Sequence, residues 1–340
     1  MTERDNLIEA FLNTTEWSTA KRGNLAGDAS NRRYERLTMQ NGNTAVLMDA
    51  PPDKGEDITP FVAIAEFLSA KGLSAPAIIA QDQTHGFLLL EDLGDAIFAR
   101  VMETQPNLEH TLYEAAIDVL VDLHRSAPPA DLPPYDQTTM SQMAAHAWRW
   151  YRRGAGLQYE QQAIAFEHAF AEVLSQYAAE TSVLIQRDYH AENLIWLPER
   201  NGVARVGLLD FQDAMAGHPA YDLVSLLQDA RRDVPENIER DMIQRYVTQT
   251  CTPHDAFDAA YHVLGAQRNL RIIGVFARLS LHFGKPHYVD FLPRVWGYLE
   301  RDLAHPALST VADRILSDLP KPTAELMQRL KDQCATIPTL

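Results

Sequence analysis

The stretch LIQRDYHAENLIWL, residues 184–197, contains two apolar runs separated by polar residues. Asp188, His190 and Asn193 lie in the polar part, where a chain that merely turns would favour short pairs such as Gly-Asp or Asn-Gly. The apolar flanks predict short buried strands. A carboxylate, an imidazole and a carboxamide between two such strands indicate a loop that carries chemistry.

A further carboxylate follows the next apolar segment, at Asp210 in VGLLDFQDA. A single Asp after a strand is most often structural, for example as a helix cap, but three Asp or Asn groups at the ends of paired strands are harder to explain in that way. An ionised Asp188 beside a hydroxyl can orient it and accept its proton. Asn193 and Asp210 are hard oxygen ligands that suit Mg²⁺, so the set favours phosphoryl transfer.

His190 leaves an alternative open. Asp188, His190 and Asp210 together could hold zinc, although hard oxygen ligands favour magnesium. A lone His beside a loop more often orients backbone than binds metal. We therefore do not expect His190 to take part directly in catalysis.

The composition limits the partners. The chain has 340 residues and a formal net charge of −16, which disfavours nucleic acid and membrane surfaces. An anionic small molecule remains compatible with this charge if a local basic pocket binds it. Cys251 and Cys334 are too few for a disulfide framework or a zinc knuckle. The N-terminus lacks a signal-peptide pattern, and no stretch approaches the roughly 20 apolar residues of a membrane span. We expect a cytoplasmic monomer.

The first part of the chain mixes strand and helix patterns. Residues 32–37 and 44–51 read as strands, and the Asn-Gly pair between them suits a tight hairpin. A helix is predicted over 59–72, with Thr59 as its N-cap. Residues 78–94 read as strand, turn and strand, followed by a linker.

The second part is dominated by helical periodicity, so a small sheet-rich lobe, 1–93, is expected before a larger helical lobe, 94–340. The helices are predicted at 107–126, 139–152, 158–180, 220–231, 235–250, 254–282, 287–302 and 321–334. Short strands are predicted at 183–187, 193–197 and 204–209.

The D-Y-H-x-x-N motif beginning at Asp188, followed by an apolar residue, Asp210 and Phe, resembles the aminoglycoside phosphotransferase and choline kinase-like family. The resemblance covers nearly the whole chain and implies an α+β, protein-kinase-like fold of two lobes, with ATP and Mg²⁺ as cofactors. It implies that Asp188 is the catalytic base and that Asn193 and Asp210 hold magnesium. It also implies that Asp222, in GHPAYDL, braces the catalytic loop by hydrogen bonds.

Two other segments resemble the nucleotide site of this family. GDASNRRY resembles the phosphate loop, which implies contacts from Ser30 and Asn31. LLLEDLGD resembles the hinge that holds adenine, which implies contacts from Glu91 and Leu93.

The chain departs from the family at two positions. Gln186 stands where the family usually has His, and the third strand, AVLMDAPP, lacks the Lys that grips the nucleotide phosphates. Glu66 would normally pair with that Lys. Arg33, rather than Arg32 or Arg36, is our candidate for the missing cation. The alternative is that Glu66 faces solvent and the arginines are surface charges.

The acceptor is expected to meet the basic segment 267–288. Arg271, Arg278 and His282 are spaced to share a helix face, and Arg suits a carboxylate. A solvated basic face is the alternative. Trp148, Trp150 and Tyr151 lie on a helix that could supply an aromatic platform for a sugar, although core packing is the more common role and is expected for at least one of the tryptophans.

GDASNRRY, VLMDAPP and QRNLRIIGVFARL together resemble one subgroup, the bacterial anomeric sugar kinases of cell-wall recycling. This resemblance implies phosphorylation of the C1 hydroxyl of N-acetylmuramate and N-acetylglucosamine, and in this subgroup the missing Lys would be normal. One of the basic residues could then meet the lactyl carboxylate of N-acetylmuramate. The rival interpretations are a kinase of choline, homoserine or an aminoglycoside, and a nucleotide-binding pseudokinase.

Overall fold

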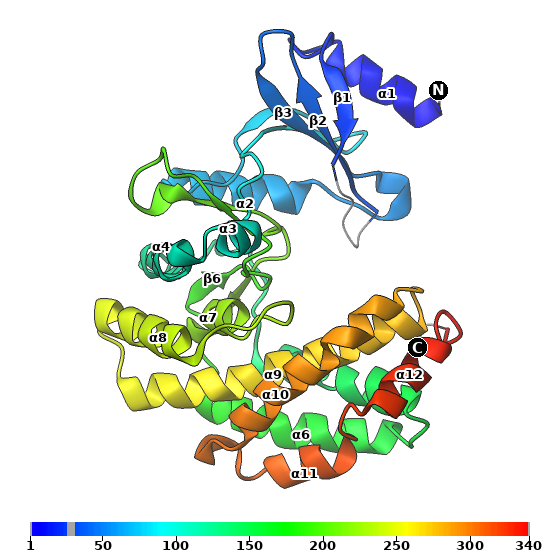
Figure 1. The fold of residues 1–340 in the computed structure, drawn as a ribbon, viewed down its shortest axis with the longest axis vertical. Helices are drawn as coiled ribbons and strands as arrows, with labels where there is room; N and C mark the ends of the chain where they lie inside the picture. Colours follow the sequence, from blue (N-terminus) through cyan, green and yellow to red (C-terminus); the bar gives the residue numbers. More distant parts are fainter. Residues whose placement is uncertain (1, 26–30, 339–340) are drawn as a thin grey trace. The chain divides into compact units, whose positions relative to one another are not determined.

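The computed structural model describes residues 2–25 and 31–338, and the chain divides into two units (Figure 1). One unit comprises Met1–Val119 and Ala191–Ala214, and the other comprises Leu120–His190 and Met215–Leu340. The residues of the predicted catalytic site therefore come from both units: Asp188 belongs to the second unit, and Asn193 and Asp210 belong to the first. The predicted lobe boundary after residue 93 stays a prediction.

The first unit is built on a five-stranded antiparallel sheet in the order β1-β2-β3-β5-β4. The strands are β1 (Lys21–Asn24), β2 (Arg33–Thr38), β3 (Thr44–Asp49), β4 (Ile78–Asp82) and β5 (Phe87–Glu91). The predicted hairpin is confirmed: β2 and β3 pair up to Thr38 and Thr44, and Gly42 in the turn has φ of 88°. Such a left-handed conformation is the reason that Gly is favoured there.

One face of this sheet is covered by the N-terminal helix α1 (Glu3–Leu12), which the sequence analysis did not predict (Figure 1). Alternate residues of a strand point to the same face, so every second side chain of β3 and β5 meets the helix. The buried cluster comprises Ile8, Phe11, Leu12, Trp17, Leu37, Ala45, Leu47, Phe87 and Leu89.

The helix predicted over 59–72 is α2, Thr59–Ala70, but its predicted N-cap is wrong. Thr59 is the first helical residue, and its backbone N–H donates to Oδ1 of Asp57 at 2.8 Å. The described residues of this unit also contain α3 (Phe98–Thr104), most of α4 (Glu109–Leu123), three short 3-10 helices and the hairpin of β7 (Leu194–Trp196) with β8 (Val206–Leu208).

The second unit is mainly helical and includes a short antiparallel pair of β6 (Val183–Ile185) with β9 (Met215–Gly217). Its helices are α5 (Gln137–Ala144), the π-helix η3 (Ala147–Arg152), α6 (Glu160–Tyr177), α7 (Ala220–Leu227), α8 (Glu236–Thr250), α9 (His254–Leu281), α10 (Leu292–Leu303), α11 (Ala312–Asp318) and α12 (Ala324–Asp332). α9 and α10 lie side by side (Figure 1). Among the described residues, no helix is long and apolar enough to cross a membrane.

The long helix α9 packs closely against the start of η3. A Cβ built on Gly274 would lie 2.2 Å from the backbone carbonyl carbon of His146, far inside van der Waals contact. Only Gly allows the two backbones to approach to this distance. This approach brings the side chains of α9 and η3 together around one pocket.

Candidate active site

A buried carboxylate holds the loop that carries Asp188. β6 ends at Ile185, and the next two residues, Gln186 and Arg187, donate their backbone N–H groups to the carboxylate of Asp222 at 2.7 and 2.9 Å. Asp222 lies in the first turn of α7 and is fully buried. The predicted bracing role of Asp222 is confirmed.

Arg187 is in the left-handed region, with φ of 72°, which costs a non-glycine residue about 1–3 kcal/mol. Its carbonyl accepts from the hydroxyl of Ser225 at 3.2 Å, and its guanidinium lies 5.6 Å from the centre of the Tyr135 ring. Together with Asp222, these contacts hold the strained turn. The position of the next residue, Asp188, is thereby fixed relative to the second unit.

The charge state of Asp188 is set by opposing effects. Burial raises the pKa of this carboxyl, but the positive charges of the second unit, led by Arg271 and including Arg268, outweigh burial and hold the pKa below its ordinary value. Both arginines come from α9. Asp188 is therefore ionised at neutral pH, the state in which it can accept a hydroxyl proton.

His190 is buried, and burial lowers its pKa to about 4, so the imidazole is neutral at neutral pH. Nη1 of Arg231 lies 3.2 Å from Nε2 of His190, and a guanidinium can only donate, so Nε2 accepts. The arrangement suits an orienting group. Within residues 2–25 and 31–338, no three His, Cys, Asp or Glu side chains are grouped as metal ligands.

Asn193 and Asp210 meet at the open end of the β7–β8 hairpin in the first unit. The backbone N–H of Leu209 donates to the carbonyl of Asn193 at 3.0 Å, and Nδ2 of Asn193 lies 3.4 Å from Oδ2 of Asp210. The amide of Gln212 donates to the other Asp210 oxygen at 2.7 Å. The structure thus brings together the two predicted metal ligands.

This pair fits magnesium. Mg²⁺ is bound in proteins by one or two carboxylate or amide oxygens and keeps several waters, and a single carboxylate beside a carboxamide is a donor set of this kind. Asp210 has φ of 57°, and the next residue, Phe211, is buried against Phe61 of α2 with ring centres 4.9 Å apart. The buried ring anchors the strained turn that presents the carboxylate.

The predicted nucleotide residues of the phosphate loop are only partly described. Ser30 lies outside the described residues. The backbone N–H of Asn31 donates to Oε1 of Glu56 at 3.1 Å, and its side-chain amide donates to the carbonyl of Lys54 at 3.3 Å. Both partners follow β3, so Asn31 is tied to the far end of the hairpin.

The predicted hinge residues follow the central part of the sheet. Glu91 ends β5, forms an ion pair with Arg200 at 2.5 Å, and accepts from the backbone N–H of Ala77 at 3.3 Å. Leu93 is buried. Both residues are held in place before any nucleotide binds, and their contacts with a nucleotide stay predictions.

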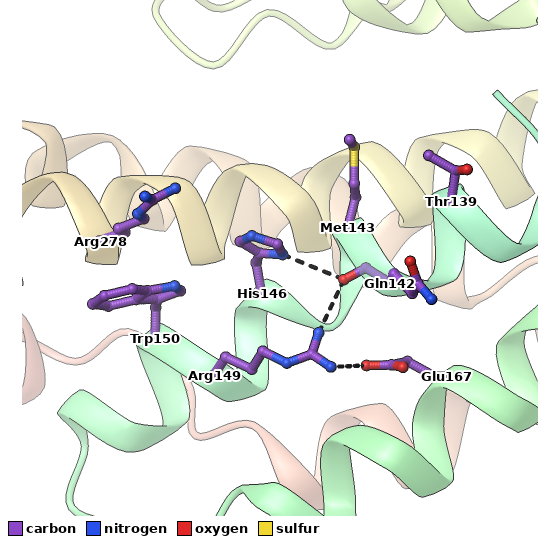
Figure 2. Close-up of a pocket in the computed structure, with 8 residues that line it drawn as sticks. All are labelled: Thr139, Gln142, Met143, His146, Arg149, Trp150, Glu167 and Arg278. Carbon is purple, nitrogen blue, oxygen red and sulfur yellow. Dashed lines mark hydrogen bonds and ion pairs between the residues drawn. The ribbon is translucent and has the colours of Figure 1, made fainter. Parts of the chain in front are cut away.

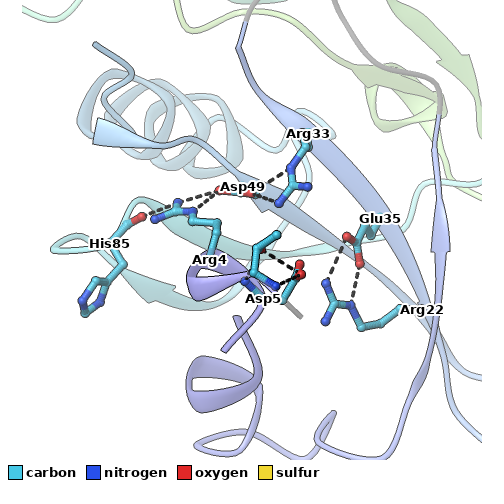
Figure 3. Close-up of polar contacts among 8 residues, drawn as sticks. Arg4, Asp5, Arg22, Arg33, Glu35, Asp49 and His85 are labelled. Atoms are coloured by element: carbon cyan, nitrogen blue, oxygen red, sulfur yellow. Dashed lines mark hydrogen bonds and ion pairs between the residues drawn. The ribbon is translucent and has the colours of Figure 1, made fainter. Parts of the chain in front are cut away.

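Arg33, our candidate for the missing cation, pairs with Asp49 (Figure 3). The Nη2–Oδ2 distance is 2.6 Å, and the same buried carboxylate also accepts from Arg4 of α1 at 2.5 Å. Arg33 and Asp49 are directly opposite in the β2–β3 ladder, on the face of Leu37 that packs on α1. Glu66 is exposed on α2. The nucleotide roles of Arg33 and Glu66 stay predictions.

Arg36 makes a set of ion pairs that the sequence analysis did not foresee. It pairs with Asp92 at 2.7 Å and with Asp95 at 2.8 Å, and both carboxylates belong to the segment that follows β5. Hydrogen bonding from Arg36 lowers the pKa of Asp95. These ion pairs link β2 to the segment that is predicted to be the hinge.

The predicted acceptor residues lie in the second unit but in different environments. Arg271 and Arg278 are two helical turns apart on α9, and His282 is its C-cap. Trp148 is fully buried, stacks on Phe166 with ring centres 4.0 Å apart, and donates its indole N–H to Asp318 at 3.1 Å. No face of its ring is exposed, which favours the core role that was weighed for it.

A pocket of about 480 Å³ lies among α5, η3, α6 and α9 (Figure 2). Arg278 and Trp150 line it, together with Arg149 and Glu167, which form an ion pair. Sequence reasoning missed this ion pair because its partners come from different helices. The aromatic and cationic pattern of AWRWYR was the available signal for this wall of the pocket.

The comparisons with known proteins agree with this geometry. Residues 23–261 match the family described as the phosphotransferase enzyme family, APH. Two relatives are named N-acetylmuramate/N-acetylglucosamine kinase. The one from Caulobacter vibrioides is 40% identical over 345 residues, covering 90% of this chain and 94% of the relative. The one from Pseudomonas aeruginosa is 36% identical over 307 residues, covering 87% and 88%.

Solved structures share the fold at low sequence identity. Choline kinase LicA from Streptococcus pneumoniae has a TM-score of 0.61 at 15% identity, covering 88% of this chain and 100% of that chain. The ADP-bound aminoglycoside phosphotransferase APH(2'')-Ib has a TM-score of 0.56 at 15% identity, covering 91% and 98%. These similarities confirm the predicted α+β, protein-kinase-like fold. Because the family match spans more than half of the chain, the protein is a phosphotransferase and belongs to the APH phosphotransferase family.

Proposed function

We propose that this phosphotransferase is an ATP- and Mg²⁺-dependent kinase of N-acetylmuramate and N-acetylglucosamine that phosphorylates the C1 hydroxyl in peptidoglycan recycling. The observation that carries the proposal is the pair of relatives with this substrate name, which match nearly end to end. The lowered pKa of Asp188 also supports it, because the ionised carboxylate can accept the proton of a sugar hydroxyl. We place the reaction in the cytoplasm and propose a monomer.

Asp188 is the proposed catalytic base. Its carboxylate hydrogen-bonds to the anomeric hydroxyl and accepts the proton as the sugar oxygen attacks the γ-phosphorus of ATP. The new O–P bond forms on C1 while the bond from phosphorus to the ADP oxygen breaks. The contacts of Arg187 and Asp222 keep the carboxylate in position, which is the main contribution a protein makes to this reaction.

Asn193 and Asp210 are the proposed magnesium ligands. When bound there, Mg²⁺ neutralises charge on phosphate oxygens. Ser30, Asn31, Arg33 and other predicted residues of the first unit would hold the nucleotide. The additional proposed nucleotide contacts are Glu66, Glu91 and Leu93.

A different alcohol acceptor is the competing function, because the structural neighbours include a choline kinase and an aminoglycoside phosphotransferase. Choline and aminoglycosides are cations and would need an acidic lining. Arg271 and Arg278, the proposed acceptor residues together with His282, give the opposite charge. An anionic or neutral sugar is therefore the better fit.

The test is an ADP-release assay with ATP and Mg²⁺ against N-acetylmuramate, N-acetylglucosamine, glucose, choline, homoserine and kanamycin. We expect turnover of the two N-acetyl sugars, with the phosphate on C1 by ³¹P NMR. Turnover of choline, homoserine or kanamycin alone would refute the proposed substrate.

Asp188→Asn tests the base. We expect kcat to fall by about 10²- to 10⁴-fold, the usual contribution of a general base, with the unfolding transition preserved. The matched control is Asp241→Asn, the same change at an exposed position of α8 in the same unit. Near-normal turnover by Asp188→Asn would remove this residue from the mechanism.

A further inference from the structure

The charge of the pocket in Figure 2 is not balanced within the protein. Glu167, its one acidic side chain, is paired with Arg149, which also donates to the carbonyl of Gln142 at 3.2 Å. Arg278, on the opposite wall, pairs with no carboxylate of the described residues. One positive charge of the pocket is therefore left over.

The guanidinium of Arg278 packs against two aromatic side chains. Its guanidinium carbon lies 5.6 Å from the centre of Trp150 and 5.2 Å from that of Phe283, and its Nε is buried without a hydrogen-bond partner. In Figure 2 the guanidinium extends from α9 above the Trp150 ring, with no dashed line to it. A guanidinium fixed on aromatic rings keeps its N–H donors available for a ligand.

The surroundings of Arg278 favour an anion. Burial lowers the pKa of His146 in the same pocket, and the charges of Arg149, Arg278 and Arg271 lower it further. The imidazole is therefore neutral at neutral pH and adds no cation of its own. Arg149 is already paired with Glu167, so Arg278 is the cation of this pocket that is suited to bind the carboxylate of a ligand.

The pocket adjoins the catalytic loop within the second unit. Nη2 of Arg187 lies 3.9 Å from the sulfur of Met143, which lines the pocket. Arg271, whose charge acts on Asp188, precedes Arg278 by seven residues of α9, or about 10 Å along the helix axis. Arg271 and Arg278 therefore lie along one helix, the first acting on Asp188 and the second lining the pocket.

We propose that Arg278 selects acceptors that carry a carboxylate, by binding that group in the pocket while the sugar hydroxyl meets Asp188. The inference rests on the proposed function and adds the residue that distinguishes an acidic from a neutral amino sugar. The ring of Trp150 packs against the guanidinium of Arg278 and helps to hold it in place. N-acetylmuramate carries a lactyl carboxylate and N-acetylglucosamine does not, so the two sugars form a matched pair of probes.

The experiment compares kcat/KM for both sugars in wild type, Arg278→Met and Arg278→Lys. Loss of a charge-assisted hydrogen bond lowers kcat/KM by about 10- to 100-fold. We expect a loss of this size for N-acetylmuramate in Arg278→Met and a much smaller loss for N-acetylglucosamine. Arg278→Lys keeps the charge but loses the planar fork, so it should fall between wild type and Arg278→Met.

Arg240→Met is the control, because it removes an exposed arginine of α8 in the same unit. We expect it to leave both kcat/KM values unchanged. Equal losses for the two sugars in Arg278→Met, or no loss for either, would overturn the assignment of Arg278.

Calorimetric titration with N-acetylmuramate separates this inference from the proposed function. If wild type turns over neither sugar, the proposed function fails by itself. Weaker binding of N-acetylmuramate to Arg278→Met than to wild type would still support the carboxylate site. Equal binding, with each variant showing a wild-type unfolding transition, would reject it.

Discussion

The hydrogen bonds to Asp222 lead to a prediction in which activity and stability respond differently. Asp222→Asn keeps the shape of the side chain but replaces one acceptor oxygen by an NH₂ group. One backbone N–H, of Gln186 or Arg187, then faces a donor. At pH 8, where Asp222 is ionised, the bonds of 2.7 and 2.9 Å are made to a charged group, and losing one removes about 1.5–3 kcal/mol of loop stabilisation.

The loop has a reason to relax once that bond is lost. Arg187 is held at φ of 72° at a cost of about 1–3 kcal/mol, which relaxation would recover. A relaxed loop favoured by about 3 kcal/mol leaves the productive position of Asp188 populated roughly once in 150 molecules, since 1.4 kcal/mol corresponds to a factor of ten. We expect kcat of Asp222→Asn to fall by about 10²-fold while KM for ATP changes little.

The free energy of unfolding should depend on pH through Asp222, because burial raises the pKa of this carboxyl to about 7. Between pH 4 and 7 the folded chain keeps a proton that the unfolded chain has released, so the stability from this group is present below pH 4 and is lost as pH rises through 7. Asn does not titrate. The stability of Asp222→Asn relative to wild type should therefore increase from pH 4 to pH 8.

The assay is steady-state kinetics at pH 8, with urea unfolding followed by tryptophan fluorescence at pH 4, 6 and 8. Asp57→Asn is the control, because its carboxylate also accepts a backbone N–H, that of Thr59, but lies at the start of α2. Wild-type kcat in Asp222→Asn would refute the bracing role. A relative stability that falls with pH would refute the direction of the pKa shift.

Two further predictions follow from the geometry of each unit. Asp210→Ala should abolish the Mg²⁺ dependence of ATP binding, since it removes the carboxylate beside Asn193; an unchanged Mg²⁺ titration would exclude that role. Gly274→Ala should lower the free energy of unfolding by about 1–3 kcal/mol, because its Cβ would lie 2.2 Å from the backbone of His146. Gly297→Ala on α10 is the control for the second change: nothing lies within 4 Å of its Cβ, and equal destabilisation of both variants in urea unfolding would contradict the close approach.

Local sequence patterns predicted the elements whose causes are local. The hairpin of β2 and β3 depends on its Asn-Gly turn, and α9 depends on a long helical period, which placed it at 254–282 against the observed His254–Leu281. The bracing role of Asp222 came from a family resemblance and is confirmed by its hydrogen bonds. The hairpin and α9 are each encoded within a short segment, whereas Asp222 bonds to residues 35 and 36 positions away and was predicted only through the resemblance.

Features that depend on distant partners could not be predicted in this way. Thr59 is a local exception: it was predicted as a cap because of its residue type, yet the side chain of Asp57, two residues earlier, makes that hydrogen bond. Arg36 belongs to β2, while its carboxylate partners follow β5. The pocket requires Arg149 and Glu167 to meet from two helices. Sequence spacing carries no information on such pairings, because only tertiary packing creates them.

The positive charges of the second unit would act on the proposed reaction in two ways that have to be compatible. Arg271 and Arg268 hold the pKa of Asp188 below its ordinary value and so make it a weak base. A weak base suffices for phosphoryl transfer, because a loose transition state gains more from an oriented hydroxyl than from early proton removal. The same charges favour an anionic acceptor. If Asp188 is the base, as proposed, its orientation therefore matters more than its basicity.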